Sequence, residues 1–213
     1  MNSPALTLPL YRRLLGDAWS ALPAPVRQMH ELPYAGGAVV ADGTASVERG
    51  SGMLARLVAG MFGFPPAGRE IPVTVEFEVR SAQEHWSRTF AGRSFASTQE
   101  AGQGRIADLL CERFGPVAIG IALVPDAGRL RFEVRRWSLF GLPLPLVLVP
   151  HGNSYEHADG GRFCFHIEIR HGLTGLIVAY RGWLVPRGFG AGELQAAAPA
   201  QVPGTLVPAG PAA

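Results

Sequence analysis

The sequence contains no lysine, because all nineteen of its basic residues are arginine. Schiff-base enzymes and P-loop nucleotide-binding proteins need a lysine, so neither class fits. The motifs G-x-S-x-G and H-E-x-x-H are also absent, which removes the usual signatures of serine hydrolases and zinc proteases. Acid–base residues are available (Glu112, Glu156 and Glu168, with His30 or His166), but the sequence does not show which of them pair. Catalytic residues therefore stay unassigned, and we predict a binding protein rather than an enzyme.

Charge and long apolar runs are also scarce. Charged residues make up 17% of the chain, apolar residues 47%, and the net charge is +2. So small a charge does not favour a nucleic-acid partner. The longest apolar runs, 53–64 and 139–149, are too short to span a bilayer, and the first ten residues lack a secretory signal. We therefore predict no transmembrane segment, although peripheral membrane contact remains open.

The chain has only two cysteines, Cys111 and Cys164, and both lie in predicted strands. Unpaired cysteines are typical of a reducing compartment, which predicts a cytoplasmic protein. Cys164 and His166 share one face of a strand, which raises the question of a metal site. Across the turn at 159–161 we expect Glu156, and not His157, to lie opposite Cys164. Because zinc needs three or four converging ligands, we predict no metal.

A glycine-rich segment precedes one predicted helix. Residues 50–55 match the pattern G-x-G-x-x-A, and Glu70 follows twenty positions after Gly50. A dinucleotide site also requires a buried parallel strand before the glycines. The preceding segment 44–49 is polar on one face instead. We interpret the glycines as the entry to a helix and predict no cofactor.

Strand patterns dominate the second half of the chain. From 130 to 186, apolar and polar residues alternate, and glycine-rich turns interrupt them. A period of two is typical of strands, and consecutive antiparallel strands must curl or close to remove their edges. We therefore predict a mainly β protein (α+β at the margin). Its fold is expected to be a strongly curved antiparallel meander or barrel of about 8–10 strands, covered or plugged by one or two short N-terminal helices.

The remaining elements follow from the same patterns. Helices are expected at 8–19, ended by Pro23 and Pro25, and at 52–62, with an apolar stripe of Leu54, Leu57, Val58 and Met61; residues 29–43 read as a loop. Strands are expected at 44–49, 71–80, 85–90, 93–98, 117–124, 130–137, 144–150, 155–157, 162–170 and 176–185. The pattern at 106–114 fits a strand or a short helix, and we favour a strand. A type I turn is expected at 125–128.

The hairpin 85–98 holds the candidate site. A two-residue turn at Ala91-Gly92 places large aromatic and arginine side chains on one face, with small polar residues on the other. Arginine stems can pack on the rings while the guanidinium groups pair with Glu76, Glu78 or Glu112. Alternatively, the arginines form an anion site at the end of an apolar cavity. The predicted ligand-binding residues are Trp86, Arg88, Phe90, Arg93, Phe95 and Glu112.

The segment 139–146 is very apolar for a connection between strands. It either packs under a loop or forms an apolar lip for a ligand or a membrane surface.

A family resemblance rests on motifs spread along the chain. They are Leu10-Tyr11-Arg12-Arg13-Leu14-Leu15-Gly16, His30, Glu48-Arg49-Gly50, Trp86-Ser87-Arg88-Thr89-Phe90, Glu112-Arg113-Phe114-Gly115-Pro116, Pro143-Leu144-Pro145, Gly161-Arg162-Phe163-Cys164-Phe165 and Tyr180-Arg181-Gly182-Trp183-Leu184. With them the chain resembles the bacterial family called domain of unknown function 4166. The resemblance implies one domain at 8–187, in a stand-alone form. Residues 1–7 are expected to be a flexible start, and the Ala/Pro/Gly-rich composition of 188–213 predicts a disordered tail. Family members also occur fused behind saccharopine-dehydrogenase-like, NAD(P)-binding modules, and the resemblance carries no activity.

Three functions remain from the sequence. The first is binding of a small amphipathic molecule, acyl-like and anionic, in an apolar cavity, and it is the one we favour. The second, implied by the resemblance, is that of an accessory or partner domain for an NAD(P)-dependent, saccharopine-dehydrogenase-like oxidoreductase. The third is a structural or interaction domain without a ligand.

Overall fold

The computed structural model describes residues 8–188. The predicted flexible start and, apart from Gly188, the predicted tail lie outside these residues. The helical elements are α1 (Leu10–Leu15), η1 (Gly16–Ala21), α2 (Ala24–Gly36), α3 (Met53–Met61), η2 (Gly104–Ile106) and η3 (Leu146–Leu148). The strands are β1 (Val39–Arg49), β2 (Gly68–Arg80), β3 (Gln83–Phe90), β4 (Arg93–Ala101), β5 (Leu110–Phe114), β6 (Val117–Asp126), β7 (Arg129–Leu139), β8 (Leu142–Pro143), β9 (Ser154–Asp159), β10 (Arg162–His171) and β11 (Gly175–Pro186).

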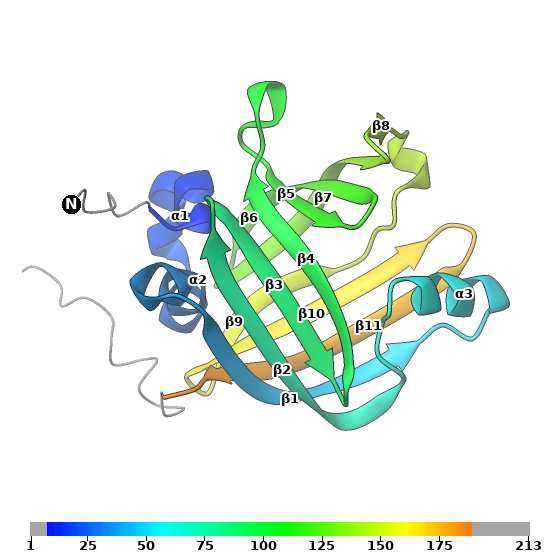
Figure 1. The fold of residues 1–213 in the computed structure, drawn as a ribbon, viewed down its shortest axis with the longest axis horizontal. Helices are drawn as coiled ribbons and strands as arrows, with labels where there is room; N and C mark the ends of the chain where they lie inside the picture. Colours follow the sequence, from blue (N-terminus) through cyan, green and yellow to red (C-terminus); the bar gives the residue numbers. More distant parts are fainter. Residues whose placement is uncertain (1–7, 189–213) are drawn as a thin grey trace, which may run out of the picture.

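The strands form a closed antiparallel barrel (Figure 1). Their order is β6-β5-β4-β3-β2-β1-β11-β10-β9-β7, and an additional β6–β7 pairing closes the ring of ten, with β8 outside it. Closure removes the exposed edges that a long antiparallel meander would otherwise present. The predicted fold class is therefore confirmed. Because β1 is antiparallel to both neighbours, the glycine-rich segment after it lacks the parallel strand of a dinucleotide-binding unit.

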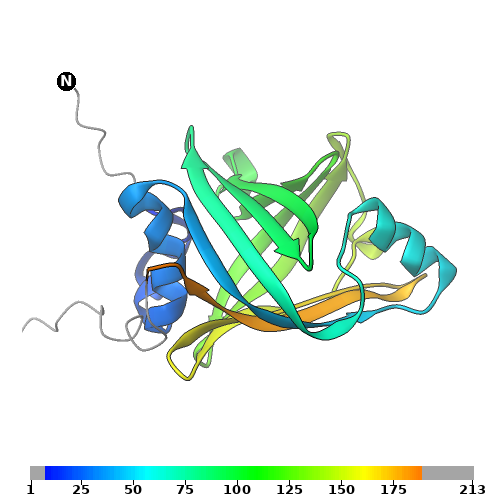
Figure 2. The same ribbon diagram turned by 60° about the horizontal axis from the view of Figure 1, so that its bottom comes forward.

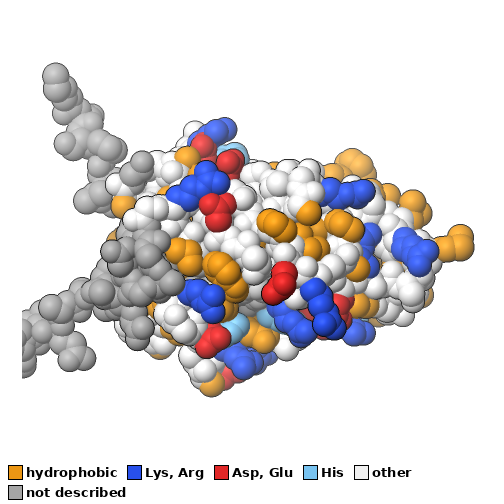
Figure 3. All heavy atoms as spheres, turned by 90° about the horizontal axis from the view of Figure 1, so that it is seen from below, with side chains coloured by type: hydrophobic (Ala, Val, Ile, Leu, Met, Phe, Trp, Pro, Cys, Tyr) orange, Lys and Arg blue, Asp and Glu red, His pale blue; other side chains and the backbone are white. Residues whose placement is uncertain are grey.

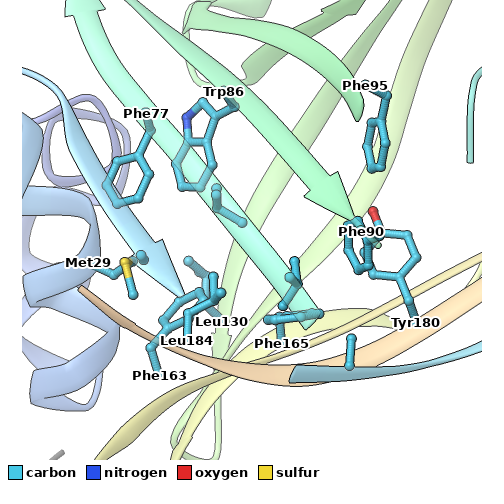
Figure 4. Packing of buried hydrophobic residues seen from close by; sticks show 14 of the residues in the cluster. Met29, Phe77, Trp86, Phe90, Phe95, Leu130, Phe163, Phe165, Tyr180 and Leu184 are labelled. Atoms are coloured by element: carbon cyan, nitrogen blue, oxygen red, sulfur yellow. The ribbon is translucent and has the colours of Figure 1, made fainter. Parts of the chain in front are cut away.

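Alternation along the strands creates the core. In β2, Ile71, Val73, Val75 and Phe77 are buried, while the residues between them face outward. Aromatic side chains from several strands meet inside the barrel (Figure 4). The rings of Phe77 and Trp86 stack at 4.7 Å between centroids. The inner faces of the strands thus supply most of the hydrophobic core.

The N-terminal helices cover one end of the barrel, and α3 lies at the opposite end (Figure 2). The predicted loop at 29–43 is wrong, because α2 spans Ala24–Gly36. Pro23 caps this helix and Pro25 sits in its first turn, where a proline loses no intrahelical hydrogen bond. The two prolines therefore begin a second helix as well as ending the first helical segment. Among residues 8–188, no helix is long and apolar enough to cross a membrane.

Helix α3 packs on the barrel through small residues. Ala55 and Ala59 are fully buried, whereas Leu54, Leu57 and Met61 of the predicted apolar stripe are exposed. Arg49 fixes the connection after α3, since its Nη1 donates to the carbonyl oxygens of Phe64 and Pro65 at 2.9 and 2.7 Å. Three of the four stripe residues are therefore exposed, and Val58 packs against the hydrophobic core.

Three local predictions differ from the structure. Residues 144–150 contain η3 instead of a strand, and 106–114 begins with a turn before β5. The β6–β7 turn has only two central residues, Ala127 and Gly128, with φ of 46° and 78°. Two positive φ angles define a type I′ turn, which fits the twist of a tight hairpin better than the predicted type I turn.

Candidate functional site

The barrel interior encloses a cavity of about 660 Å³. Side chains from strands β2 to β7 and β9 to β11 line it, and most of them are apolar. The cavity extends to the surface near α3, η3 and the β10–β11 turn, because Leu54, Leu148 and Leu173 line it and are also exposed. At the helix-covered end it reaches the buried Tyr11 of α1. It is therefore an apolar chamber with an exposed mouth at the α3 end.

A polar cluster lies on the wall of this chamber. Glu112 Oε1 accepts hydrogen bonds from Ser97 Oγ at 2.6 Å, Gln99 Nε2 at 3.1 Å and Arg88 Nη2 at 3.3 Å. Arg88 Nη1 also donates to Ser97 Oγ at 2.9 Å, and Tyr11 OH donates to Gln99 Oε1 at 3.1 Å. Arg88, Glu112, Gln99 and Tyr11 all border the cavity. One positive and one negative charge thus neutralise each other inside an apolar wall.

The predicted hairpin register is confirmed. Arg88 pairs with Phe95 and Trp86 with Ser97, as a two-residue turn requires. The guanidinium carbon of Arg88 lies 5.3 Å from the Trp86 ring centroid and 5.7 Å from that of Phe95, a cation–π arrangement. Arg88 is paired with Glu112. The geometry therefore matches a structural role for this arginine better than a role in an anion site.

The structure brings only part of the predicted site together. Trp86, Arg88, Phe90 and Glu112 line the cavity, and Phe95 is buried beside them. Arg93 does not reach the cavity and is exposed. It is the first residue of β4, directly after the tight turn, and it is exposed although it lies opposite the buried Phe90 in the register. Placing Arg93 with the inward-facing residues was therefore wrong.

A second buried polar network joins α2 to the barrel. His30 is fully buried, and its Nε2 lies 2.8 Å from Glu156 Oε2. Its ring stacks on Tyr11 at 3.6 Å between centroids. Of the candidate acid–base residues, the structure pairs His30 with Glu156. Glu168 accepts a hydrogen bond from Arg170, and His166 stacks on Tyr155.

Glu84 is not among the residues predicted from the sequence, yet it is almost completely buried. Its carboxylate accepts hydrogen bonds from Tyr34 OH at 2.9 Å and Trp86 Nε1 at 3.0 Å. Burial raises the pKa of Glu84, and burial also raises that of Tyr34. The missed signal was the strand boundary, because β3 begins at Gln83 and its alternation places Glu84 on the same inward face as Trp86.

One register prediction near the cysteine is also wrong. Cys164 pairs with His157, and Phe165 pairs with Glu156, because the β9–β10 turn has two central residues and not three. Cys164 and His157 are therefore direct neighbours across the strands. Even so, within residues 8–188 no group of three or more His, Cys, Asp or Glu side chains is arranged to hold a metal ion. Both cysteines are free thiols.

Fold and site together define a class: a closed ten-stranded antiparallel barrel with an internal apolar cavity that opens at one end. The model of the family called "Domain of unknown function (DUF4166)" matches residues 22–184, which is most of the chain. The chain therefore belongs to this family. Among curated proteins, none matches the chain.

Proposed function

We propose that this domain binds a small amphipathic, acyl-like molecule inside the barrel. The observation that carries the proposal is the cavity of about 660 Å³ with a largely apolar lining. Pockets of roughly 300–1,000 Å³ with few polar groups are typical of sites for small ligands. A solid interior would have contradicted this function, and it would have favoured a domain that serves only as structure.

The polar end of the ligand is expected at the Arg88–Glu112 cluster. An anionic group was predicted, but Arg88 already donates to Ser97 and Glu112. A carboxylate ligand would have to lie beside the Glu112 carboxylate, and like charges at short range repel. A neutral group that donates to Glu112 and accepts from Arg88 avoids this repulsion. We therefore favour a hydroxyl or amide head over an anion.

A series of straight-chain alcohols from octanol to hexadecanol tests the proposal, with displacement of a fluorescent probe as the readout. Each buried methylene contributes about 0.8 kcal/mol, so affinity should rise about tenfold for every two carbons. The rise should stop once the chain fills the cavity. Dodecanoic acid, at a pH where it is ionised, should bind more weakly than dodecanol. Absence of saturable binding across the whole series would refute the proposal.

A matched pair of variants locates the binding. Ile119 lines the cavity, and its neighbour Ala118 lies at the next position of the same strand, which alternation directs outward. Ile119→Trp should fill part of the cavity and abolish binding of the longer alcohols. Ala118→Trp adds a larger increment of bulk at the adjacent position and should leave binding unchanged. Equal effects of the two substitutions would place the ligand elsewhere. Native mass spectrometry of freshly purified protein gives an independent readout, because a co-purified lipid would appear directly.

Two further predictions have no additional structural support. A partnership with an NAD(P)-dependent oxidoreductase rests on the family resemblance, and a cytoplasmic location rests on the two free cysteines. Co-purification with a reductase would favour the first. For catalysis, His30 offers little access, because it is fully buried and does not border the cavity.

A further inference from the structure

The mouth of the cavity is surrounded by exposed apolar side chains. They come from three segments that are distant in sequence: α3 at 53–61, the β7–β9 connection at 139–150 and the β10–β11 turn at 171–176. All three lie at the same end of the molecule, on the right of Figures 1 and 2. We call these segments the rim. Its exposed large hydrophobic residues are Met53, Leu54, Leu57, Met61, Leu139, Phe140, Leu142, Leu146, Val147, Leu148 and Leu173.

Several rim side chains are exposed over most of their surface. Met53 is 87% exposed, Val147 84%, Leu173 80% and Phe140 78%. Outside the rim, Leu8 is the one other large hydrophobic residue within 8–188 that is exposed to a comparable degree. Exposed apolar side chains gathered at one end of a molecule usually mark a site of protein or membrane contact.

The charges around the rim help to distinguish a protein partner from a membrane. The three rim segments contain no aspartate or glutamate. Arg56 lies on α3, Arg69 follows at the start of β2, and Arg93 is close to the end of α3, since Gly63 packs near Ser94 and Phe95. Within residues 8–188, none of these three arginines has a carboxylate within salt-bridge distance. Figure 3 shows hydrophobic and basic side chains protruding together at this end.

Acidic side chains also occur near the rim: Glu70 is exposed beside Arg69, and Glu48 and Glu168 lie on the neighbouring strands. Glu48 and Glu168 are paired with Arg181 and Arg170, whereas Arg56, Arg69 and Arg93 form no such pair within the described residues, so the balance around the rim favours positive charge. An apolar surface with basic neighbours is complementary to a bilayer that carries anionic lipids. The apolar side chains can enter the acyl region while the arginines stay at the level of the headgroups. We propose that the rim docks on an anionic bilayer surface and that the mouth exchanges the ligand with that bilayer.

This inference rests on the proposed function, because a bilayer is a source of ligand only if the cavity binds an acyl-like molecule. Several rim residues, among them Leu54, Met61 and Leu148, also line the cavity. Docking would therefore join two apolar phases without exposing the ligand to water. An acyl chain that left a bilayer through open water would expose its methylenes to water, which is unfavourable, and a docked mouth avoids that exposure.

Vesicle flotation tests the docking. Vesicles of phosphatidylcholine alone are compared with vesicles in which part of the lipid is phosphatidylglycerol. The wild-type protein should bind the anionic vesicles more strongly, and high salt should weaken this binding. Arg56→Glu should lower the partition coefficient about fivefold or more, because each arginine near an anionic surface contributes roughly that factor. The double variant Met53→Ser/Leu57→Ser should lower it at least about tenfold.

Matched controls lie at the helix-covered end of the barrel. Leu8 and Arg12 are also exposed, so Leu8→Ser and Arg12→Glu make the same chemical changes away from the rim. These controls should bind vesicles like the wild type. If they weaken binding as much as the rim variants do, or if neutral and anionic vesicles bind equally, the proposal is overturned. Failure of the wild type to bind any vesicle, together with rim-dependent self-association, would assign the rim to a protein partner instead.

Dodecanol binding in the absence of vesicles separates the two proposals. If dodecanol binds while anionic vesicles do not, the docking inference fails and the cavity function stands. If vesicles bind through the rim while no alcohol enters the cavity, the proposed function fails and the exchange of ligand fails with it. Because every substituted rim residue is exposed, thermal unfolding of the variants should match that of the wild type.

Discussion

Arg88→Leu is the most informative substitution in the barrel wall. The side chain donates to Ser97 at 2.9 Å and to Glu112 at 3.3 Å, and leucine removes both donors while keeping part of the apolar stem. Glu112 then remains in an apolar wall as an unpaired carboxylate. Breaking a buried charge pair from one side costs about 3–5 kcal/mol. Glu112 keeps its bonds from Ser97 and Gln99, so we expect a loss near the lower limit, about 3 kcal/mol.

Urea-induced unfolding measures this loss, with Arg93→Leu as the matched control. Arg93 belongs to the same hairpin but is exposed, so its substitution should change the free energy of unfolding by less than about 0.5 kcal/mol. Glu112→Gln and the double variant complete a thermodynamic cycle. Since the two side chains are in contact, a coupling energy of about 1–3 kcal/mol is expected between them.

The opposite outcome would change the interpretation of the site. If Arg88→Leu leaves the empty protein as stable as the wild type, the ion pair contributes no stability and the structural role is refuted. Weaker dodecanoic acid binding by the same variant would then make Arg88 the anchor of an anionic ligand. A large stability loss together with unchanged ligand affinity would confine Arg88 to the structural role.

Two further predictions concern the sheet. A Cβ at Gly182 would lie 2.1 Å from the carbonyl oxygen of Thr44, so Gly182→Ala should cost about 1–3 kcal/mol in urea unfolding, whereas Gly172→Ala, with open space around it, should be nearly neutral. Burial lowers the pKa of His157 and of His166, so the unfolded chain takes up protons more readily below about pH 6.5 and stability should fall on acidification. Unfolding at pH 7.5 and 5.5 should show a smaller fall in the double variant His157→Gln/His166→Gln; an equal fall would contradict this assignment.

The sequence predicted the barrel because alternation is a local property. Each strand of the ring carries its own period of two, and the need to remove edges leaves a strongly curved sheet or a closed barrel as the expected results. The hairpin 85–98 was predicted to the exact register, since a two-residue turn leaves only one pairing. The β9–β10 hairpin was misread by one position because Asp159 was counted as part of the turn, although it pairs with Arg162. A shift of one residue moves side chains to the opposite face.

Other features depend on context that a local pattern does not contain. Proline ends one helix and is equally suited to the first turn of the next, so Pro23 and Pro25 do not distinguish a loop from the start of α2. The stripe on α3 indicated burial, but Ala55 and Ala59 allow the closer approach to the sheet and leave Leu54, Leu57 and Met61 exposed. An internal cavity is also invisible in sequence, since apolar residues that line a void alternate just as those in a solid core do.

The two ends of the barrel differ, and this difference orients the proposed ligand. A chain of hydrogen bonds runs from Tyr11 of α1 through Gln99 to Glu112 and Arg88. The opposite end is bordered by the apolar rim. An amphipathic molecule in this chamber is therefore expected to place its polar head on the cluster and to direct its chain toward the mouth. Chains longer than the distance from cluster to rim would protrude at the rim, where a docked bilayer, and not water, would receive the excess methylenes.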